Sequence, residues 1–111
     1  KIETVNGINF LGIKTNLDAG SVKNILFQLK SEQENLFAII GTEDNGKAVL
    51  SIVISDNLVE SNNLDAGKMV RELAGKHIQG GGGGQKFFAT AGGKKAGGLQ
   101  DAIDEAKTAI M

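Results

Sequence analysis

Five consecutive glycines at residues 80–84 are the feature that most constrains how this chain folds. Glycine has no Cβ and loses more backbone entropy on ordering than other residues, about 0.5–1 kcal/mol each relative to alanine. Ten of the 16 glycines lie between Gly75 and Gly98, and proline is absent, which excludes a generic Pro/Gly linker. Core packing does not explain such a run. What the run offers is an uncovered backbone, whose N–H groups can approach a phosphate, a sugar or a base plane.

The charge distribution marks the same region. The chain has a formal net charge of −1, yet residues 76–95 contain four lysines and neither Asp nor Glu. A polyanion would bind preferentially to that stretch. A solvated loop that carries lysines for solubility is the alternative interpretation.

Length and composition indicate one ordinary globular domain that spans residues 1–111. The absence of cysteine excludes disulfides and thiolate metal sites, which is compatible with a cytoplasmic protein. No apolar run approaches the ~20 residues of a membrane span, and no signal peptide is visible. Because the chain begins with Lys1 and not with Met, we expect it to be excised from a larger protein.

Three strands are predicted at residues 7–14, 36–41 and 48–55, where short runs are apolar and rich in β-branched residues. The last two are apolar almost throughout, which predicts burial on both faces of a sheet. Asn45-Gly46 between them predicts a tight hairpin. A fourth, shorter strand is predicted at residues 86–91.

Three helices are predicted. Asp18 is a suitable N-cap for the first helix, whose apolar residues recur at i, i+3, i+4 and i+7 from Val22. The second opens at Asn62, Asn63 and Asp65 and ends at the glycine run, and the third covers residues 99–110. Gly80–Gly84 and Gly92–Gly98 are expected to be loops. The fold class is α/β (α+β), with a small mixed sheet of about four strands packed with three helices in the order β-α-β-β-α-(β)-α.

The known nucleotide-binding motifs do not occur. Neither a Walker loop nor a Gly-x-Gly-x-x-Gly spacing is present, so ATP binding by this segment is not expected. His77 is the only histidine and is expected to be structural, since it lies on the apolar stripe of the second helix. Asp101, Asp104 and Glu105 complement the dipole of the last helix. No triad, carboxylate dyad or metal cluster is apparent.

A phosphate cradle is one interpretation of the basic glycine-rich stretch. Gly92-Gly93-Lys94-Lys95 is followed by Gly97-Gly98 at the start of the last helix, where unpaired N–H groups and a positive dipole end favour anions. A disordered tether followed by an ordinary loop is the other interpretation. Of Phe87 and Phe88, the outward-facing ring would stack on a base or ribose. Alternatively, both rings contact the core.

The run Gly80–Gly84, followed at a short distance by Ala89-Thr90-Ala91-Gly92-Gly93, resembles the glycine-rich block near the C-terminus of bacterial alanyl-tRNA synthetases. In that family a glycine run precedes Ala-x-Ala-Gly-Gly by a short variable stretch. The resemblance covers essentially the whole chain and is most specific over residues 64–110. Many members carry Arg-Pro after the glycines, where this chain has Gln85-Lys86. A charge contact of that arginine does not transfer to Gln85, and Lys86 is expected to substitute for it.

The resemblance implies a C-terminal (DHH-associated) domain that contacts the outer corner of tRNA and helps aminoacylation and editing act on the same tRNA. It implies no catalytic residue, metal or cofactor in this fragment. The parent would be an alanine–tRNA ligase that uses ATP, Mg and Zn. We expect a monomeric fragment whose partners are tRNA-Ala and the other synthetase domains. The RNA-binding residues expected are Gly80, Gly81, Gly82, Gly83, Gly84, Gln85, Lys86, Lys94 and Lys95.

Two alternatives remain open at the level of sequence. The first is the substrate-holding domain of a DHH-type phosphoesterase, but those enzymes usually carry a histidine within the glycine block, which Gly80–Gly84 lacks. The second is a scaffold domain whose glycines are only flexible loops. Removal of Lys86, Lys94 and Lys95 would weaken RNA binding and leave the binding of a scaffold unchanged.

Overall fold

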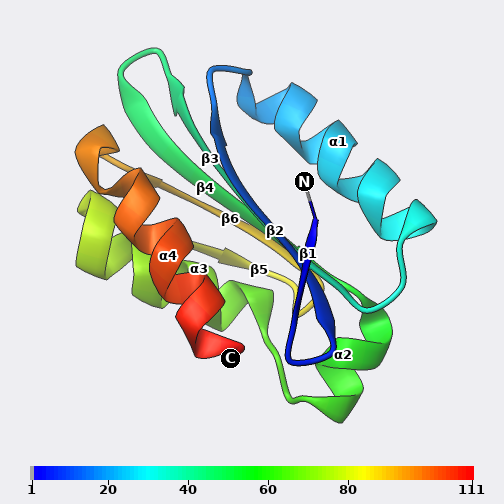
Figure 1. Ribbon diagram of the computed structural model, residues 1–111. Helices are drawn as coiled ribbons and strands as arrows, with labels where there is room; N and C mark the ends of the chain where they lie inside the picture. Colours follow the sequence, from blue (N-terminus) through cyan, green and yellow to red (C-terminus); the bar gives the residue numbers. More distant parts are fainter. Residues whose placement is uncertain (1) are drawn as a thin grey trace.

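One six-stranded sheet with helices on both faces forms the domain (Figure 1). The computed structural model describes residues 2–111. The sheet order is β1-β2-β3-β4-β6-β5; β2 and β3 are parallel, and every other neighbouring pair is antiparallel. The strands are β1 (Glu3–Val5), β2 (Ile8–Thr15), β3 (Leu36–Asp44), β4 (Lys47–Ile54), β5 (Gly80–Gly84) and β6 (Phe88–Gly93).

Helices occupy the connections. They are α1 (Ala19–Glu32), α2 (Asp56–Ser61), α3 (Ala66–Leu73) and α4 (Leu99–Ala109), with a π-helical turn η1 (Ala74–Ile78) and a 3₁₀ turn η2 (Ala96–Gly98). Helix α1 is the crossover between the parallel strands and covers one face of the sheet, while α3 and α4 cover the other (Figure 1). The predicted α+β class is confirmed, with six strands in place of about four.

The extra strand at the start of the chain is formed by a hairpin that the prediction overlooked. Asn6 and Gly7 have φ angles of 53° and 80°, which match 54° and 80° at Asn45 and Gly46 in the predicted β3–β4 hairpin. Positive φ at both central residues defines a two-residue turn whose twist suits paired strands. The same dipeptide therefore builds both hairpins.

The prediction that Gly80–Gly84 and Gly92–Gly98 are loops is wrong for the first segment and partly wrong for the second. Gly80–Gly84 is β5, the edge strand, and it pairs with β6 in a register that places Gly80 opposite Gly93 and Gly84 opposite Ala89. Strand β6 correspondingly begins later than the predicted strand and includes Gly92. Pairing with a neighbour satisfies the backbone groups of the glycines, so tertiary context overrides their low intrinsic strand propensity.

The helix boundaries follow the capping residues. Asp18 accepts hydrogen bonds from the backbone N–H of Ser21 at 2.8 Å and from its hydroxyl at 3.1 Å, and these bonds lower the pKa of the Asp18 carboxyl. The second predicted helix begins at Ala66, because Asp65 is the N-cap and accepts from the N–H of Lys68. Helix α2 was not predicted; it has six residues, too few to show a helical period.

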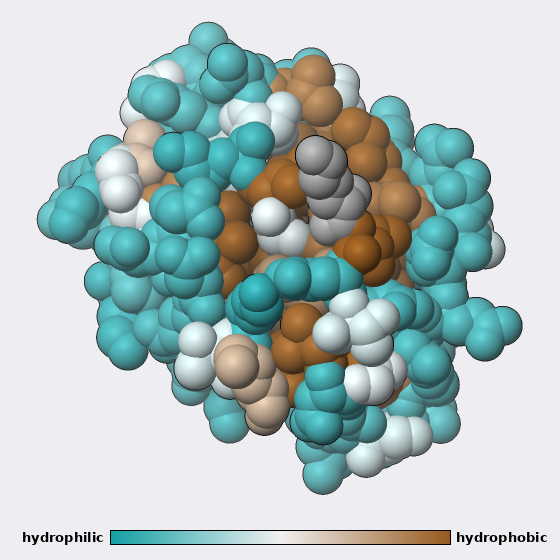
Figure 2. Space-filling model, in the orientation of Figure 1, coloured by the Kyte–Doolittle hydropathy of each residue, from teal (hydrophilic) through white to brown (hydrophobic). Residues whose placement is uncertain are grey.

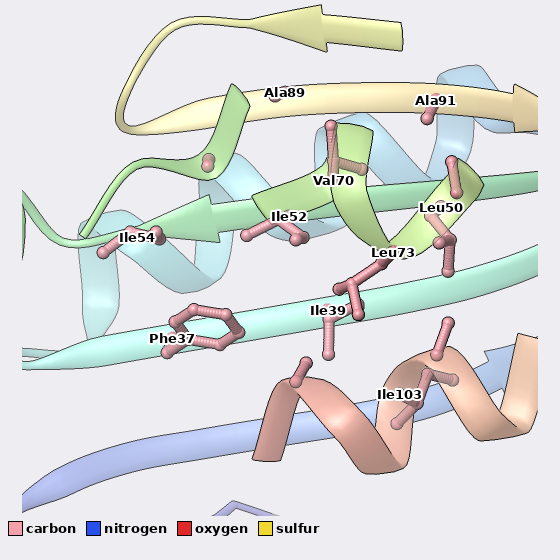
Figure 3. Close-up of a cluster of buried hydrophobic side chains, with 14 of the residues drawn as sticks. Phe37, Ile39, Leu50, Ile52, Ile54, Val70, Leu73, Ala89, Ala91 and Ile103 are labelled. Carbon is pink, nitrogen blue, oxygen red and sulfur yellow. The ribbon is translucent and has the colours of Figure 1, made fainter. Parts of the chain in front are cut away.

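Two apolar layers hold the sheet. Strands β3 and β4 are buried on both faces, as predicted. The larger layer lies beneath α3 and α4, where it includes Phe37, Ile39, Leu50, Ile52, Val70, Leu73, Ala89, Ala91 and Ile103 (Figure 3). The smaller layer lies beneath α1 and is centred on Val22, Leu26 and Val53. Polar residues cover the outer sides of α1 and α4, while apolar atoms reach the surface between α1 and β2 (Figure 2).

Candidate nucleic-acid interface

Three of the five glycines in β5 are required by the fold. A Cβ on Gly80 or Gly82 would overlap a carbonyl oxygen of β6, and one on Gly84 would lie 2.7 Å from the carbonyl oxygen of Phe88. On the other side, a Cβ on Gly67 of α3 would lie 2.9 Å from the carbonyl oxygen of Gly84. Strand β5 is therefore held between β6 and α3 at distances that exclude side chains.

Gly81 and Gly92 are glycines for which the fold gives no reason. A Cβ on Gly81 would meet no atom within 4 Å, and one on Gly92 would meet only the carbonyl oxygen of Ala48, at 3.9 Å. Neither residue has a positive φ. The two are opposite each other in the β5–β6 register, and both are exposed. Together they form a patch of bare peptide backbone, which we call the Gly81–Gly92 patch.

This patch lies on the same face of the sheet as α1, in the part of that face that α1 does not cover. Ala89 and Ala91 of β6 point into the core beneath α3 and α4, whereas Thr90 and Gly92 alternate with them and are exposed. Helix α1 packs on β3 and β4, so β5 and the far end of β6 have no helix above them on that face (Figure 1).

Two lysines flank the patch. An open hollow of about 350 Å³ is lined by Lys47, Gln79, Gly80, Gly92, Gly93 and Lys94. The β4–β6 register brings Lys47 here, because it pairs Ala48 with Gly93. Within residues 2–111, neither lysine forms a salt bridge with an acidic side chain. The hollow therefore combines exposed ammonium groups with bare backbone, and its composition suits an anionic ligand.

The structure spreads the predicted RNA-binding residues along β5. Lys94 and Gly80 line the hollow, and the other glycines of the run lead away from it. Lys95 is next to the hollow, with its backbone N–H bonded to the carbonyl oxygen of Ile78 at 2.9 Å. Gln85 and Lys86 follow the other end of β5. That end, Gly84, lies roughly 13 Å from Gly80, because the two are four residues apart in an extended strand. Lys47 and Gln79 were not among the predicted residues. Lys47 reaches the hollow through the strand register, which the sequence alone does not show. Gln79 is distinguished by its positive φ angle of 54°.

The phenylalanines beside the hairpin already have partners. Phe88 packs on Phe27 of α1 with ring centroids 4.8 Å apart, and the Lys23 ammonium lies 5.9 Å from the Phe88 ring. Phe87 is 37% exposed, and the Lys30 ammonium lies 5.3 Å from its ring. Phe87 is therefore the ring that retains an outward surface.

His77 links the turn that precedes β5 to α4. Its Nε2 lies 2.8 Å from the Glu105 carboxylate, and the Lys76 ammonium lies 3.0 Å from the same oxygen. The hydrogen bond with His77, followed by that with Lys76, lowers the pKa of Glu105. The arrangement supports the structural role predicted for His77. The prediction that Glu105 complements the helix dipole is wrong, because only Asp101 lies in the first turn of α4; the contacts with His77 and Lys76 give Glu105 its role instead.

No three His, Cys, Asp or Glu side chains of residues 2–111 come together as a ligand set. None of the helices in this range has the length and apolarity to span a bilayer.

The architecture defines the protein class as a small α+β domain with a glycine edge strand. It is similar to the C-Ala domain from Aquifex aeolicus alanyl-tRNA synthetase, with a TM-score of 0.85 and 23% identity, over 99% of this chain and 97% of that one. At this identity the similarity shows the fold. The DHHA1 domain family matches residues 5–111, and the chain belongs to that family.

The curated relatives include alanine–tRNA ligases. The Christiangramia forsetii ligase is 52% identical over 110 residues, which are 99% of this chain and 12% of the ligase. The Bacteroides thetaiotaomicron ligase is 51% identical over 105 residues, 94% of this chain and again 12% of the ligase. The chain thus spans about an eighth of the length of these relatives, and the resemblance predicted from the glycine block is confirmed.

Alanine substitutions distinguish the structural glycines from the Gly81–Gly92 patch. Gly82→Ala is expected to lower the free energy of unfolding by about 1–3 kcal/mol, because its Cβ would overlap the carbonyl oxygen of Thr90. Gly81→Ala should leave it unchanged or raise it by up to about 1 kcal/mol, since the space is open and the unfolded chain loses entropy. Urea unfolding followed by circular dichroism measures both. Equal destabilisation would contradict the assignment.

The His77–Glu105 contact should make stability depend on acidic pH. Because the pKa of Glu105 in the folded protein lies below its ordinary value of 4.5, its contribution is present above that value and is lost as pH falls through the folded pKa. Glu105→Gln should therefore narrow the difference in unfolding free energy between about pH 6 and about pH 3. Urea unfolding at both pH values tests this, with Asp104→Gln as the matched control on the same helix. An unchanged pH dependence would contradict the role of Glu105.

Proposed function

We propose that this domain binds tRNA as an accessory domain of an alanine–tRNA ligase. The observation that carries the proposal is the Gly81–Gly92 patch beside Lys47 and Lys94. Two glycines without a packing role face solvent on neighbouring strands, and two ammonium groups without an acidic partner in residues 2–111 flank them. A folded RNA offers the matching chemistry, since its surface combines phosphates with riboses and exposed base planes.

Contact with the outer corner of tRNA fits this geometry. A corner is recognised through shape, stacking and backbone contacts, so it requires no hydrogen-bonding code for base edges. A side chain on Gly81 or Gly92 would hold a flat ligand away from the peptide planes. Lys47 and Lys94 would meet phosphates at the margin of the contact. Lys86 and the exposed Phe87, at the other end of β5, would extend the contact along the RNA.

Two lysines and a bare backbone predict weak, salt-sensitive binding by the domain alone. In a ligase that also binds the tRNA elsewhere, the second contact becomes intramolecular and raises the overall affinity without any new interaction. Such an arrangement would keep one tRNA in place while aminoacylation and editing act on it. The domain would contribute binding and positioning, and the chemistry, with its ATP and metal requirements, would belong to other parts of the ligase.

The substrate-holding domain of a DHH-type phosphoesterase is the second candidate. The match to the DHHA1 family favours it as much as the first. The absence of histidine from Gly80–Gly84 and the ligase relatives at about half identity both favour the tRNA-binding role. Binding of tRNA-Ala in preference to a short single-stranded oligonucleotide would distinguish the two.

Replacement of the two hollow lysines should weaken RNA binding. For Lys47→Ala/Lys94→Ala we expect a reduced affinity for tRNA-Ala and a slope of log affinity against log salt that is shallower by about 1 per lysine. Filter binding at several salt concentrations measures both quantities. Lys68→Ala/Lys107→Ala removes the same charge from α3 and α4, on the other face, and is the matched control. Identical affinity of the two double variants for tRNA-Ala would contradict the proposed interface.

A further inference from the structure

Helices α3 and α4 lie beside each other on the face of the sheet opposite the Gly81–Gly92 patch (Figure 1). Two adjoining hollows share Met69, Glu72 and Ala109, and they therefore form one continuous groove between the two helices. Leu73 and Ala106 complete an apolar floor beneath it. The RNA-binding proposal does not use this surface.

The rim of the groove is acidic. Asp65, Glu72 and Glu105 line it, against one ammonium group from Lys68. At one end of the groove, Glu105 already contacts Lys76 and His77. Glu72 is exposed and takes part in none of the salt bridges found in residues 2–111. With Lys68 and Lys76 set against the three carboxylates, the groove keeps a small net negative charge, opposite in sign to that at Lys47 and Lys94.

From this combination we infer that the groove binds a basic amphipathic helix of a protein partner. Apolar side chains spaced at i, i+3, i+4 and i+7 would lie on the floor between the two helices, and Lys or Arg residues beside them would face Glu72 and Asp65. A surface formed by two helices presents ridges and grooves that accept a third helix. Met69 adapts its shape to different apolar partners because its side chain is unbranched and flexible.

The opposite placement of the two surfaces has a functional consequence. A helix in this groove and an RNA on the Gly81–Gly92 patch would be separated by the sheet, so both can be bound at once. An extended strand is a poorer occupant, since the neighbouring edge strand β5 runs alongside α3 and offers no open edge into the groove. The inference does not rest on the tRNA-binding proposal.

The test uses a fluorescent 14-residue peptide with Leu at helical spacing and Lys elsewhere, titrated with the full chain and followed by anisotropy. Ala109→Gln places a longer side chain in the groove and should weaken peptide binding by about tenfold. The variant should still fold, because residue 109 is exposed and glutamine is a good helix former. Glu72→Lys should weaken it roughly threefold to fivefold and should strengthen binding of the matched peptide in which Glu replaces Lys.

Several outcomes would overturn the inference. These are absence of binding, equal binding of a peptide with the same composition at strand spacing, or binding that Ala109→Gln leaves unchanged. Self-association of the chain that Ala109→Gln abolishes, measured by sedimentation velocity, would identify a second copy as the occupant. Binding of tRNA should be the same in the wild type and in both variants, so the outcome is independent of the RNA proposal.

Discussion

The antiparallel pairing of β5 with β6 is the interaction on which the rest of the structure depends. It gives a glycine run with little intrinsic order a fixed conformation, and it places Gly81 opposite Gly92. Because β6 also pairs with β4, the same ladder brings Lys47 to the end of the glycine strand. Close packing of β5 on β6 is possible only because Gly80, Gly82 and Gly84 carry no Cβ, so geometry explains these three glycines of the run.

The sheet separates two surfaces of opposite character. On the face that α1 covers only in part, bare backbone lies around one hollow together with Lys47 and Lys94, neither of which forms a salt bridge within residues 2–111. On the other face, α3 and α4 enclose an apolar floor with carboxylates at its rim. A net charge of −1 conceals this division, because positive and negative groups nearly balance over the whole chain. Charge arranged in this way suits two different partners at once.

Local signals predicted the parts of the fold that local interactions determine. The N-cap at Asp18, the Asn45-Gly46 hairpin and the buried central strands were all predictable, since each depends on a few adjacent residues. The Asn6-Gly7 hairpin had the same signal, but its first strand has three residues, too short to show alternation. Strand formation by the glycines depends on a partner strand and leaves no periodic pattern. The basic, glycine-rich character of the site was predictable, but the register that adds Lys47 was not.

Amide chemical-shift changes in the isotope-labelled chain on titration with tRNA-Ala test the central claim most directly. If the exposed glycine backbone is the RNA-binding surface, the largest changes will occur at Gly81, Gly92 and Lys94, with smaller ones at Lys86 beyond the far end of β5. Residues of the groove between α3 and α4 will remain unaffected. Changes confined to that groove, or an absence of change along β5, would contradict the account.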